Sequence, residues 1–253
     1  MRRTGKIRIL NVPLDMADMK EALEIFRDLM LTSGCSLIVT PNSEIVVSAD
    51  KDKELAAIIE SADLVIPDGI GLVYASRLMG LPLKERVTGI DFLSHAFQAL
   101  ASEGKSVFLL GSRPRDKENP STAELAAVNI GESFPGLRIA GTHHGYFTAE
   151  DEKGIVEQIN SSGADFLCVA LGSPKQEKFM FRHKERLNAK AAIGVGGSLD
   201  VWAGTVKRAP EFYRKHGLEW LYRFAKEPAR YRRLGALPVF MIKVLMSKGG
   251  VKK

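Results

Sequence analysis

A chain of 253 residues with 45% apolar and 26% charged residues has the size and composition of a globular protein with a substantial buried core. Its two cysteines are too few for a disulfide framework or a metal site, and this indicates a reducing compartment. The chain lacks both the roughly 20-residue apolar run that predicts a transmembrane helix and the apolar segment of a signal peptide. We therefore expect a cytoplasmic protein.

The charge is concentrated at one end of the chain. Residues 205–253 contain 13 Lys/Arg and 3 Asp/Glu, a balance of +10, whereas residues 1–204 carry a balance of −4. Such a segment predicts an anionic partner: nucleic acid, a membrane surface or a phosphorylated ligand. We therefore predict two parts, an α/β catalytic core over residues 1–204 and a basic, amphipathic helical C-terminal appendage over residues 205–253.

In chain order, the first predicted elements are a strand and a helix. The strand covers Ile7–Val12, and the helix runs to about Leu31. Either Asp15 or Asp18 could cap the start of this helix.

The next segment predicts a strand–helix–strand unit. Two short apolar runs, Leu37–Val39 and Leu64–Ile66, have the length and β-branched content of buried strands. The helical pattern between them covers Glu44–Ser61, which is long enough for a parallel crossover. In such units, ligands bind beyond the carboxyl ends of the strands.

Three polar residues follow these two strands. Thr40, Asn42 and Asp68 would emerge together at the same edge of the sheet. A hydroxyl, an amide and a carboxylate suit a polar, hydroxyl-rich substrate. Alternatively, Asn42 and Asp68 could merely cap the helices that follow them, since both types are favoured caps. Their convergence favours a site.

Strands and helices alternate through the rest of residues 1–204. The further predicted helices are Leu72–Met79, Asp91–Ser102, Ala123–Phe134, Glu150–Ser161 and Lys175–Leu187. The further predicted strands are Val107–Leu110, Leu137–Gly141, Phe166–Leu171 and Ala191–Val195. This alternation predicts a Rossmann-like, mostly parallel sheet with helices on both faces.

Three of these strands lead into a glycine followed by a serine. The glycines are Gly111, Gly172 and Gly197. Glycine lets a ligand approach the backbone, and a following helix N-terminus offers free N–H groups to phosphate. Each glycine alone is typical of a tight turn, but three at one edge suggest a nucleotide crevice. The run GVGGS at 194–198 does not match the dinucleotide-binding pattern.

The run GSPKQEKF at 172–179 places polar side chains in the first turn of a predicted helix. Lys175 and Gln176 could contact a ligand there, and Gln176 could read a sugar or a base. The alternative is a solvated first turn, for which Glu177 is electrostatically well placed.

Two short patterns could suggest a metal, but neither is convincing. The adjacent His143 and His144 diverge in most backbone geometries and have no third ligand at a suitable spacing. Asp50 and Asp52 match a DxD pattern but fall inside or between helices, away from a strand end. We therefore predict no metal and no cofactor.

The basic C-terminal segment interleaves aromatic and cationic residues. Arg223, Arg230 and Arg233 share one helix face if Pro228 does not break the helix. The apolar run Leu234–Met246 is too short to cross a membrane but could lie in its interface. A helix packed on the core, or a site for single-stranded nucleic acid, would explain the same pattern. The pattern favours a lipid-linked phosphate over nucleic acid.

Seven motifs, in order, resemble the WecG/TagA/CpsF family of bacterial glycosyltransferases. They are TPNSEIV (40–46), PDGIG (67–71), ERVTGID (85–91), GTHHGYF (141–147), GSPKQE (172–177), GVGGSLD (194–200) and GLEWLYR (217–223). The resemblance implies inverting transfer of a sugar, often N-acetylmannosamine, from a UDP donor to undecaprenyl-diphosphate-linked N-acetylglucosamine. Transfer of its uronic acid or a glucose-type sugar stays an alternative. The segment 113–122 is more polar and proline-rich than is usual in the family.

The resemblance also implies roles for individual residues and partners. It assigns Asp68 as the general base. It assigns substrate or diphosphate contacts to Thr40, Asn42, Arg86, Gln176, Arg223, Arg230 and Arg233. The implied location is peripheral, on the cytoplasmic face of an anionic cell membrane, without nucleic acid. A homo-oligomer is left open.

Two other classes of protein remain as alternatives. A non-catalytic nucleic-acid binder would need the basic appendage but not Asp68. A different small-molecule α/β enzyme would need Asp68 but not the appendage.

Overall fold

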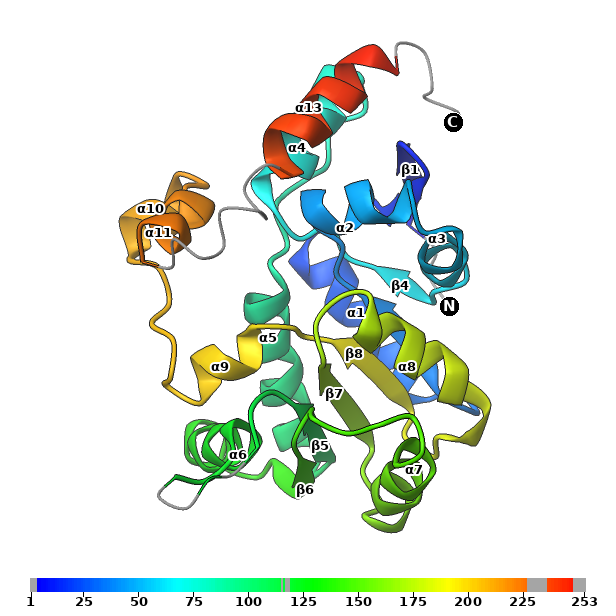
Figure 1. The fold of residues 1–253 in the computed structure, drawn as a ribbon, viewed down its shortest axis with the longest axis vertical. Helices are drawn as coiled ribbons and strands as arrows, with labels where there is room; N and C mark the ends of the chain where they lie inside the picture. Colours follow the sequence, from blue (N-terminus) through cyan, green and yellow to red (C-terminus); the bar gives the residue numbers. More distant parts are fainter. Residues whose placement is uncertain (1–3, 115, 117–118, 227–235, 248–253) are drawn as a thin grey trace.

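The core of the protein is a parallel sheet of six strands in the order β4-β3-β8-β7-β5-β6 (Figure 1). The computed structural model describes residues 4–114, 116, 119–226 and 236–247. The strands are β3 (Ser36–Val39), β4 (Leu64–Val65), β5 (Ser106–Gly111), β6 (Arg138–His143), β7 (Phe166–Ala170) and β8 (Ala191–Gly194). The prediction of a mostly parallel sheet is confirmed.

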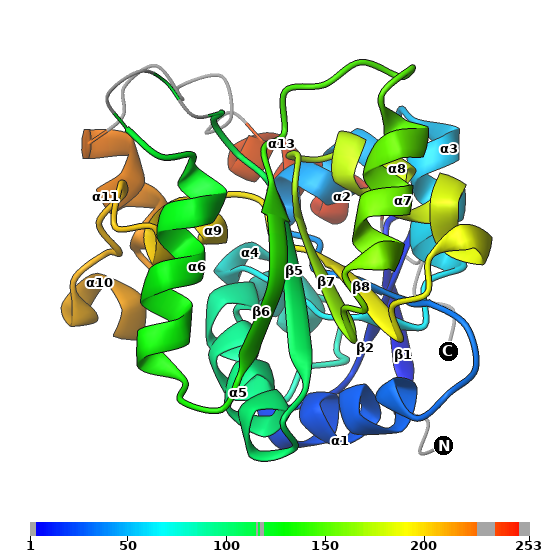
Figure 2. The ribbon, with the colours of Figure 1, turned by 90° about the horizontal axis from the view of Figure 1, so that it is seen from below.

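Helices cover both faces of this sheet, as predicted (Figure 2). One face is covered by α2 (Ser43–Ala49), α3 (Lys53–Glu60), α4 (Ile70–Leu78), α7 (Glu152–Ser161) and α8 (Lys175–His183), which continues into the 3₁₀ turn Lys184–Arg186. The other face is covered by α1 (Met19–Met30), α5 (Gly89–Ser102), α6 (Thr122–Ser133) and α9 (Ser198–Trp202). Because both faces are buried, the central strands β5, β7 and β8 are largely apolar, whereas every residue of the edge strand β6 is half-buried or exposed. In β7, for example, Leu167 packs into one layer and Phe166 into the other.

The prediction of one strand over Ile7–Val12 is wrong. The structure has an antiparallel hairpin of β1 (Lys6–Ile9) and β2 (Val12–Asp15), separate from the main sheet. The chain turns at Leu10, whose φ of 52° lies in the left-handed region. Buried apolar residues stand on both sides of the turn, so the run reads as a single strand.

The single helix predicted over Glu44–Ser61 is also wrong, because it is two helices. α2 ends at Ala49, and Asp52 starts α3 by accepting the N–H of Leu55 on Oδ1 at 3.0 Å. A side chain that caps a helix N-terminus competes with continuation of the preceding helix, which explains the break.

The structure also decides which aspartate starts α1. Asp18 forms a reciprocal capping box with Glu21. Asp15 instead lies on β2, where its buried Oδ2 accepts the N–H of Val65 at 2.8 Å. It thereby ties the hairpin to β4.

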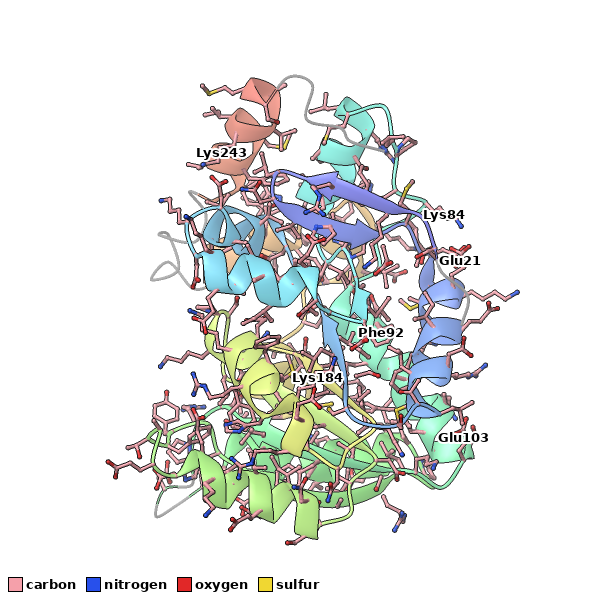
Figure 3. All side chains as sticks on the ribbon, turned by 90° about the vertical axis from the view of Figure 1, so that its right-hand side faces the viewer. Glu21, Lys84, Phe92, Glu103, Lys184 and Lys243 are labelled. Atoms are coloured by element: carbon pink, nitrogen blue, oxygen red, sulfur yellow. The ribbon has the colours of Figure 1, made fainter. Side chains whose placement is uncertain are left out.

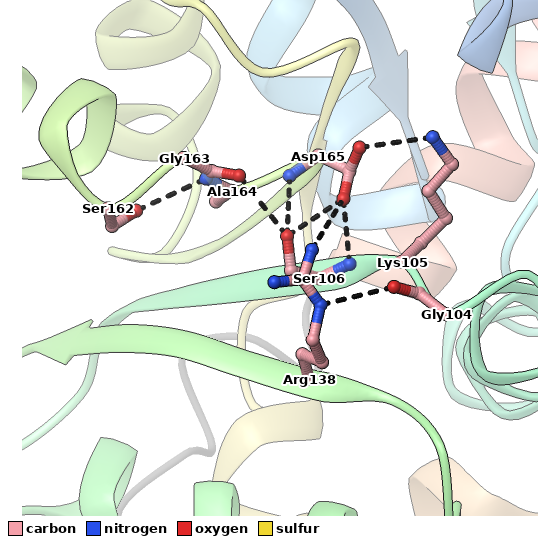
Figure 4. Close-up of polar contacts among 8 residues, drawn as sticks. All are labelled: Gly104, Lys105, Ser106, Arg138, Ser162, Gly163, Ala164 and Asp165. Carbon is pink, nitrogen blue, oxygen red and sulfur yellow. Dashed lines mark hydrogen bonds and ion pairs between the residues drawn. The ribbon is translucent and has the colours of Figure 1, made fainter.

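Carboxylates also fix the amino ends of the central strands. Asp165, just before β7, accepts the N–H and the hydroxyl of Ser106 at 2.9 and 2.8 Å (Figure 4). Lys105 adds an ion pair at 3.3 Å. Asp63, just before β4, does the same for β3 by accepting the N–H of Leu37 at 2.8 Å. These anchors satisfy strand-end N–H groups that would otherwise lack partners.

In the part of the C-terminal segment that the structure describes, the chain forms α10 (Glu211–Lys215), α11 (Glu219–Lys226) and α13 (Ala236–Met246). α13 packs against α2 and α4, where it buries Phe240 and Val244 (Figure 1). Lys243 of α13 forms an ion pair with Asp50 at the end of α2 (Figure 3). Among the helices of the described residues, none combines the length and the apolar character needed to span a bilayer.

We predict that Asp165→Asn lowers the free energy of unfolding by about 1–3 kcal/mol at pH 7, because it weakens several bonds to one half-buried carboxylate. Burial alone would raise the pKa of Asp165, but the bonds from Ser106 and Lys105 outweigh it and lower that pKa. The carboxylate therefore stabilises the fold above its unfolded pKa of about 3.9, and the benefit is lost as pH falls through the lower folded pKa.

Urea unfolding at pH 7 and near pH 3 measures this difference. Glu103→Gln, at an exposed acid at the end of α5, is the control for the change of charge. If Asp165→Asn is as stable as this control at pH 7, the anchor contributes nothing.

Candidate active site

Three strand ends from distant parts of the chain meet at one edge of the sheet. β3 pairs with β4 through Val39 and Val65, and with β8 through Ile38 and Ile193. Because the pairs are parallel, the loops that follow these strands leave the sheet side by side. This edge is where a ligand is expected in an open α/β sheet.

Thr40 and Asp68 share one small space at this edge. The Thr40 hydroxyl donates to the carbonyl oxygen of Gly194 at 3.1 Å, which joins the ends of β3 and β8. Gly89, the first residue of α5, lies against both side chains. A methyl group there would be 3.3 Å from Asp68 Oδ2 and 3.6 Å from Thr40 Oγ1. The predicted convergence of Thr40 and Asp68 is confirmed, and their roles stay a prediction.

Asn42 is the N-cap residue of a helix, whereas the N-cap residue of the helix after Asp68 is Gly69. Asn42 Oδ1 accepts the N–H of Ile45 at 3.0 Å and so starts α2. α4 begins after Gly69, which has a φ of 129° and provides no side-chain cap. The N–H of Asp68 donates to the carbonyl oxygen of Pro41 at 2.9 Å, which links the two loops. The alternative of a helix cap therefore holds for Asn42. Asp68 is not the N-cap residue of α4 and lies at the edge of the sheet.

Gln176 is held inside the protein. Its side-chain oxygen accepts the N–H of Gly196 at 3.1 Å, and its amide nitrogen donates to Glu177 at 2.8 Å. Gln176 and Glu177 are only 3% and 1% exposed, so the alternative of a solvated first turn does not hold for these two residues. Lys175, the first residue of α8, is exposed.

The three predicted glycines have different surroundings. A methyl group on Gly111 would be 2.4 Å from the carbonyl oxygen of Ala170, so glycine is required there for the approach of β7. Gly172 has a φ of 75° and open space beside it. A methyl group on Gly197 would be 3.8 Å from Asp200 Oδ2. Close backbone approach therefore explains Gly111, while Gly172 and Gly197 border free space or a polar group.

Sequence reasoning missed the contact between Ser112 and Asp200. Ser112, at the end of β5 with a φ of 57°, donates its hydroxyl to Asp200 Oδ1 at 3.0 Å. A non-glycine residue with positive φ at a strand end is a signal of a constrained site, but it is visible only in the structure. The contact places a carboxylate beside the Gly197 turn.

A hollow of about 540 Å³ lies beside the end of β6 and the start of α7. Its lining includes His143, His144, Tyr146 and Phe147. His143 Nδ1 is bonded to the carbonyl oxygen of His144 at 2.7 Å. Among the described residues, no group of three or more His, Cys, Asp or Glu side chains could hold a metal ion.

Both aspartates of the DxD pattern make structural contacts. Asp50 binds Lys243 and accepts the side-chain amide of Asn11 at 2.9 Å. Asp52 caps α3 and pairs with Lys178 at 2.8 Å. The interpretation that this pattern lies between helices, away from a strand end, is confirmed.

Arg86 connects the active-site edge to the C-terminal helices. It pairs with Glu219 of α11 at 3.0 Å and donates to the carbonyl oxygen of Arg214 at 3.3 Å. Beside it, Arg208 pairs with Asp91 of α5 at 2.6 Å. Burial would raise the pKa of Asp91, but the Thr88 hydroxyl and Arg208 outweigh burial and lower that pKa.

The three predicted C-terminal arginines are not among the side chains that the structure describes. Arg223 belongs to α11, of which only the backbone is described at this position. Arg230 and Arg233 lie outside the described residues.

Comparison with known proteins identifies the family. Residues 7–253 match the family described as "Glycosyl transferase WecG/TagA/CpsF family". This chain belongs to that family. A Staphylococcus aureus protein named N-acetylglucosaminyldiphosphoundecaprenol N-acetyl-beta-D-mannosaminyltransferase is 34% identical over 99% of this chain and 96% of its own length. A Bacillus spizizenii protein of the same name is 37% identical over 83% and 79%.

Membership of the WecG/TagA/CpsF family confirms the resemblance seen in the sequence motifs and makes the chain a glycosyltransferase. The motif segments TPNSEIV and PDGIG contain Thr40 and Asp68, which meet at one edge of the sheet. The family motif ERVTGID contains Gly89, which lies against both of these side chains.

We predict that Gly89→Ala lowers turnover by about tenfold or more while leaving the fold intact, because the added methyl group crowds Asp68 and Thr40. Alanine is a better helix former than glycine, so the melting temperature should not fall. Gly131→Ala in α6, where the methyl group meets only Ile139 at an ordinary 3.9 Å, is the control. Turnover equal to that of the control would show that the reaction does not need the space beside Asp68.

Proposed function

We propose that this glycosyltransferase moves N-acetylmannosamine from a UDP donor to N-acetylglucosaminyl-diphospho-undecaprenol, with inversion at the anomeric carbon. The observation that carries the proposal is the placement of Asp68 Oδ2 beside Thr40 and Gly89 at the shared end of β3, β4 and β8. The printed names of the relatives in Staphylococcus and Bacillus support the choice of donor sugar and acceptor.

In this mechanism Asp68 is the general base. Its carboxylate takes the proton of the acceptor hydroxyl as the hydroxyl oxygen bonds to the anomeric carbon of the donor. The bond from that carbon to the diphosphate oxygen breaks on the opposite face, and UDP leaves with the bonding electrons. Gly89 leaves room for the acceptor at the carboxylate, and Thr40 is fixed by its bond to Gly194.

Positive groups would stabilise the diphosphate charge. Arg86, Arg208 and Arg214 come together near the start of α5, where Glu219 and Asp91 hold two of them in place. Guanidinium groups bind phosphate oxygens through charge-assisted hydrogen bonds. We include Arg223, Arg230 and Arg233 in the same role because the resemblance to the family suggests them.

The remaining residues of the proposed site complete the donor and acceptor contacts. Ser112 and Gly172 lie on loops that follow β5 and β7, and Asp200 lies in α9, which follows β8 of the same sheet. We assign them, with Lys175 and Gly197, to the polar lining of the donor crevice. Asn42 contributes to the site indirectly, because it caps α2 and so fixes the loop beside Asp68.

We predict that Asp68→Asn lowers the turnover number by about 10²–10⁴, because the amide keeps the shape of the side chain but cannot take a proton. The measurement is UDP release with UDP-N-acetylmannosamine and a short-chain lipid diphosphate acceptor. Asp28→Asn on α1 is the control, since it makes the same chemical change away from this edge. Near wild-type turnover in Asp68→Asn would assign the base to another residue.

We also propose that the segment 205–253 is an appendage that binds the surface of an anionic membrane. α13 buries one side on the core and exposes the other: Ile242 and Leu245 are both 56% exposed. On the neighbouring α4, Tyr74 and Leu78 are also exposed. An apolar surface beside a basic segment is typical of a protein that lies on a lipid interface.

We predict that the double change Ile242→Gln and Leu245→Gln removes most binding to phosphatidylglycerol vesicles in a flotation assay. Full burial of each apolar side chain contributes about 1.5–3 kcal/mol, which salt does not screen. Leu31→Gln, an exposed residue after α1, is the control. If the double variant floats as well as the control, this face does not bind lipid.

A further inference from the structure

Gln176 and Glu177 form a buried pair whose hydrogen bonds fix one orientation of the Gln176 amide. The oxygen of that amide accepts the N–H of Gly196 at 3.1 Å, and its nitrogen donates to Glu177 Oε1 at 2.8 Å. Rotating the amide by 180° would place nitrogen against an N–H donor and oxygen against a carboxyl oxygen. Glu177 is therefore one of the two groups that decide how Gln176 points.

The same amide supports the turn that follows β8. Besides bonding to Gly196, Gln176 packs against Gly194 so closely that a methyl group there would be 2.5 Å from its Nε2 atom. The carbonyl oxygen of Gly194 is the acceptor for the Thr40 hydroxyl. A continuous set of contacts thus leads from Glu177, through Gln176 and the 194–196 turn, to Thr40 beside Asp68.

We propose that Glu177 is a positioning residue for sugar transfer: it holds the Gln176 amide, which fixes the 194–196 turn and thereby the place of Thr40 next to Asp68. This inference rests on the proposed function, because it takes Asp68 and Thr40 as the reacting edge. Glu177 itself does not touch substrate in this account.

The cost of burying Glu177 supports a role other than packing. Its Oε2 atom is buried and has no hydrogen-bond partner among the described residues. Burial raises the pKa of this carboxyl group, although the bond from Gln176 and further contacts with its own backbone N–H and the Ser173 side chain oppose the shift. An apolar side chain of similar size would avoid these penalties, so a carboxyl group here costs stability.

The decisive variant is Glu177→Met, which preserves volume but cannot accept the bond from Gln176. We expect a melting temperature equal to or above that of the wild type, together with a turnover number lowered by about 10²-fold at little changed KM. Glu177→Gln keeps an oxygen acceptor and should restore most of the activity. Glu185→Ala, at an exposed acid just after α8, is the control.

A double-mutant cycle tests whether the two side chains act as one unit. Gln176→Met should also lower the turnover number by about 10²-fold. The double variant should lower it by about 10²-fold, whereas two independent effects would lower it by about 10⁴-fold. A loss of turnover in the double variant equal to the product of the two single losses overturns the proposal. A Glu177→Gln variant as impaired as Glu177→Met also overturns it, as does a Glu177→Met variant that melts well below the wild type.

Amide hydrogen exchange provides a readout that does not depend on the reaction. Exchange of the Gly196 N–H should be faster in Glu177→Met than in the wild type and close to normal in Glu177→Gln. Unchanged exchange in Glu177→Met contradicts the positioning role, whatever the activity. If the wild type fails to transfer the sugar, the proposed function fails, but the exchange result still decides whether Glu177 fixes the turn.

Discussion

Parallel pairing of β3 with β4 on one side and β8 on the other brings three distant chain segments to one edge of the sheet. Thr40, Asp68 and Gly194 meet only because these three strands end at the same level. The hydrogen bond from Thr40 to Gly194 then locks two of the ends together. Half-buried carboxylates hold the opposite edge, where Asp63 and Asp165 bind the amino ends of β3 and β5. The edge that carries the candidate site is thus built around β3, which is held at both ends.

The part of the site that could be predicted follows from local patterns. Two apolar runs with a helix between them predict a parallel crossover. In such a crossover both strands end at the same edge of the sheet, which places Thr40 and Asp68 together. The family motifs add residues such as Arg86, whose partner is distant in the sequence. Local patterns fail where one sequence pattern is compatible with two different secondary structures. The apolar run through Leu10 contains a turn and is not a single strand. Asp52 caps a new helix within a pattern that predicts one continuous helix.

The contacts that could not be predicted join residues that are far apart in the chain. Arg86 meets Glu219, Ser112 meets Asp200, and Asp50 meets Lys243. No periodicity or spacing encodes such pairs, since they depend on how whole layers pack. The buried pair of Gln176 and Glu177 was misleading for a similar reason. Its polar residues suggest a solvated helix start, yet the turn after β8 covers them.

Asp68 is the one carboxylate to which we assign the chemistry, and the stereochemistry of the product tests this role most directly. NMR can compare the configuration at the anomeric carbon of the UDP donor with that of the sugar in the purified lipid-linked product. A single base acting on the acceptor hydroxyl predicts complete inversion. Retention would require a nucleophile on the opposite face of the sugar and a covalent intermediate, and it would contradict the role given to Asp68.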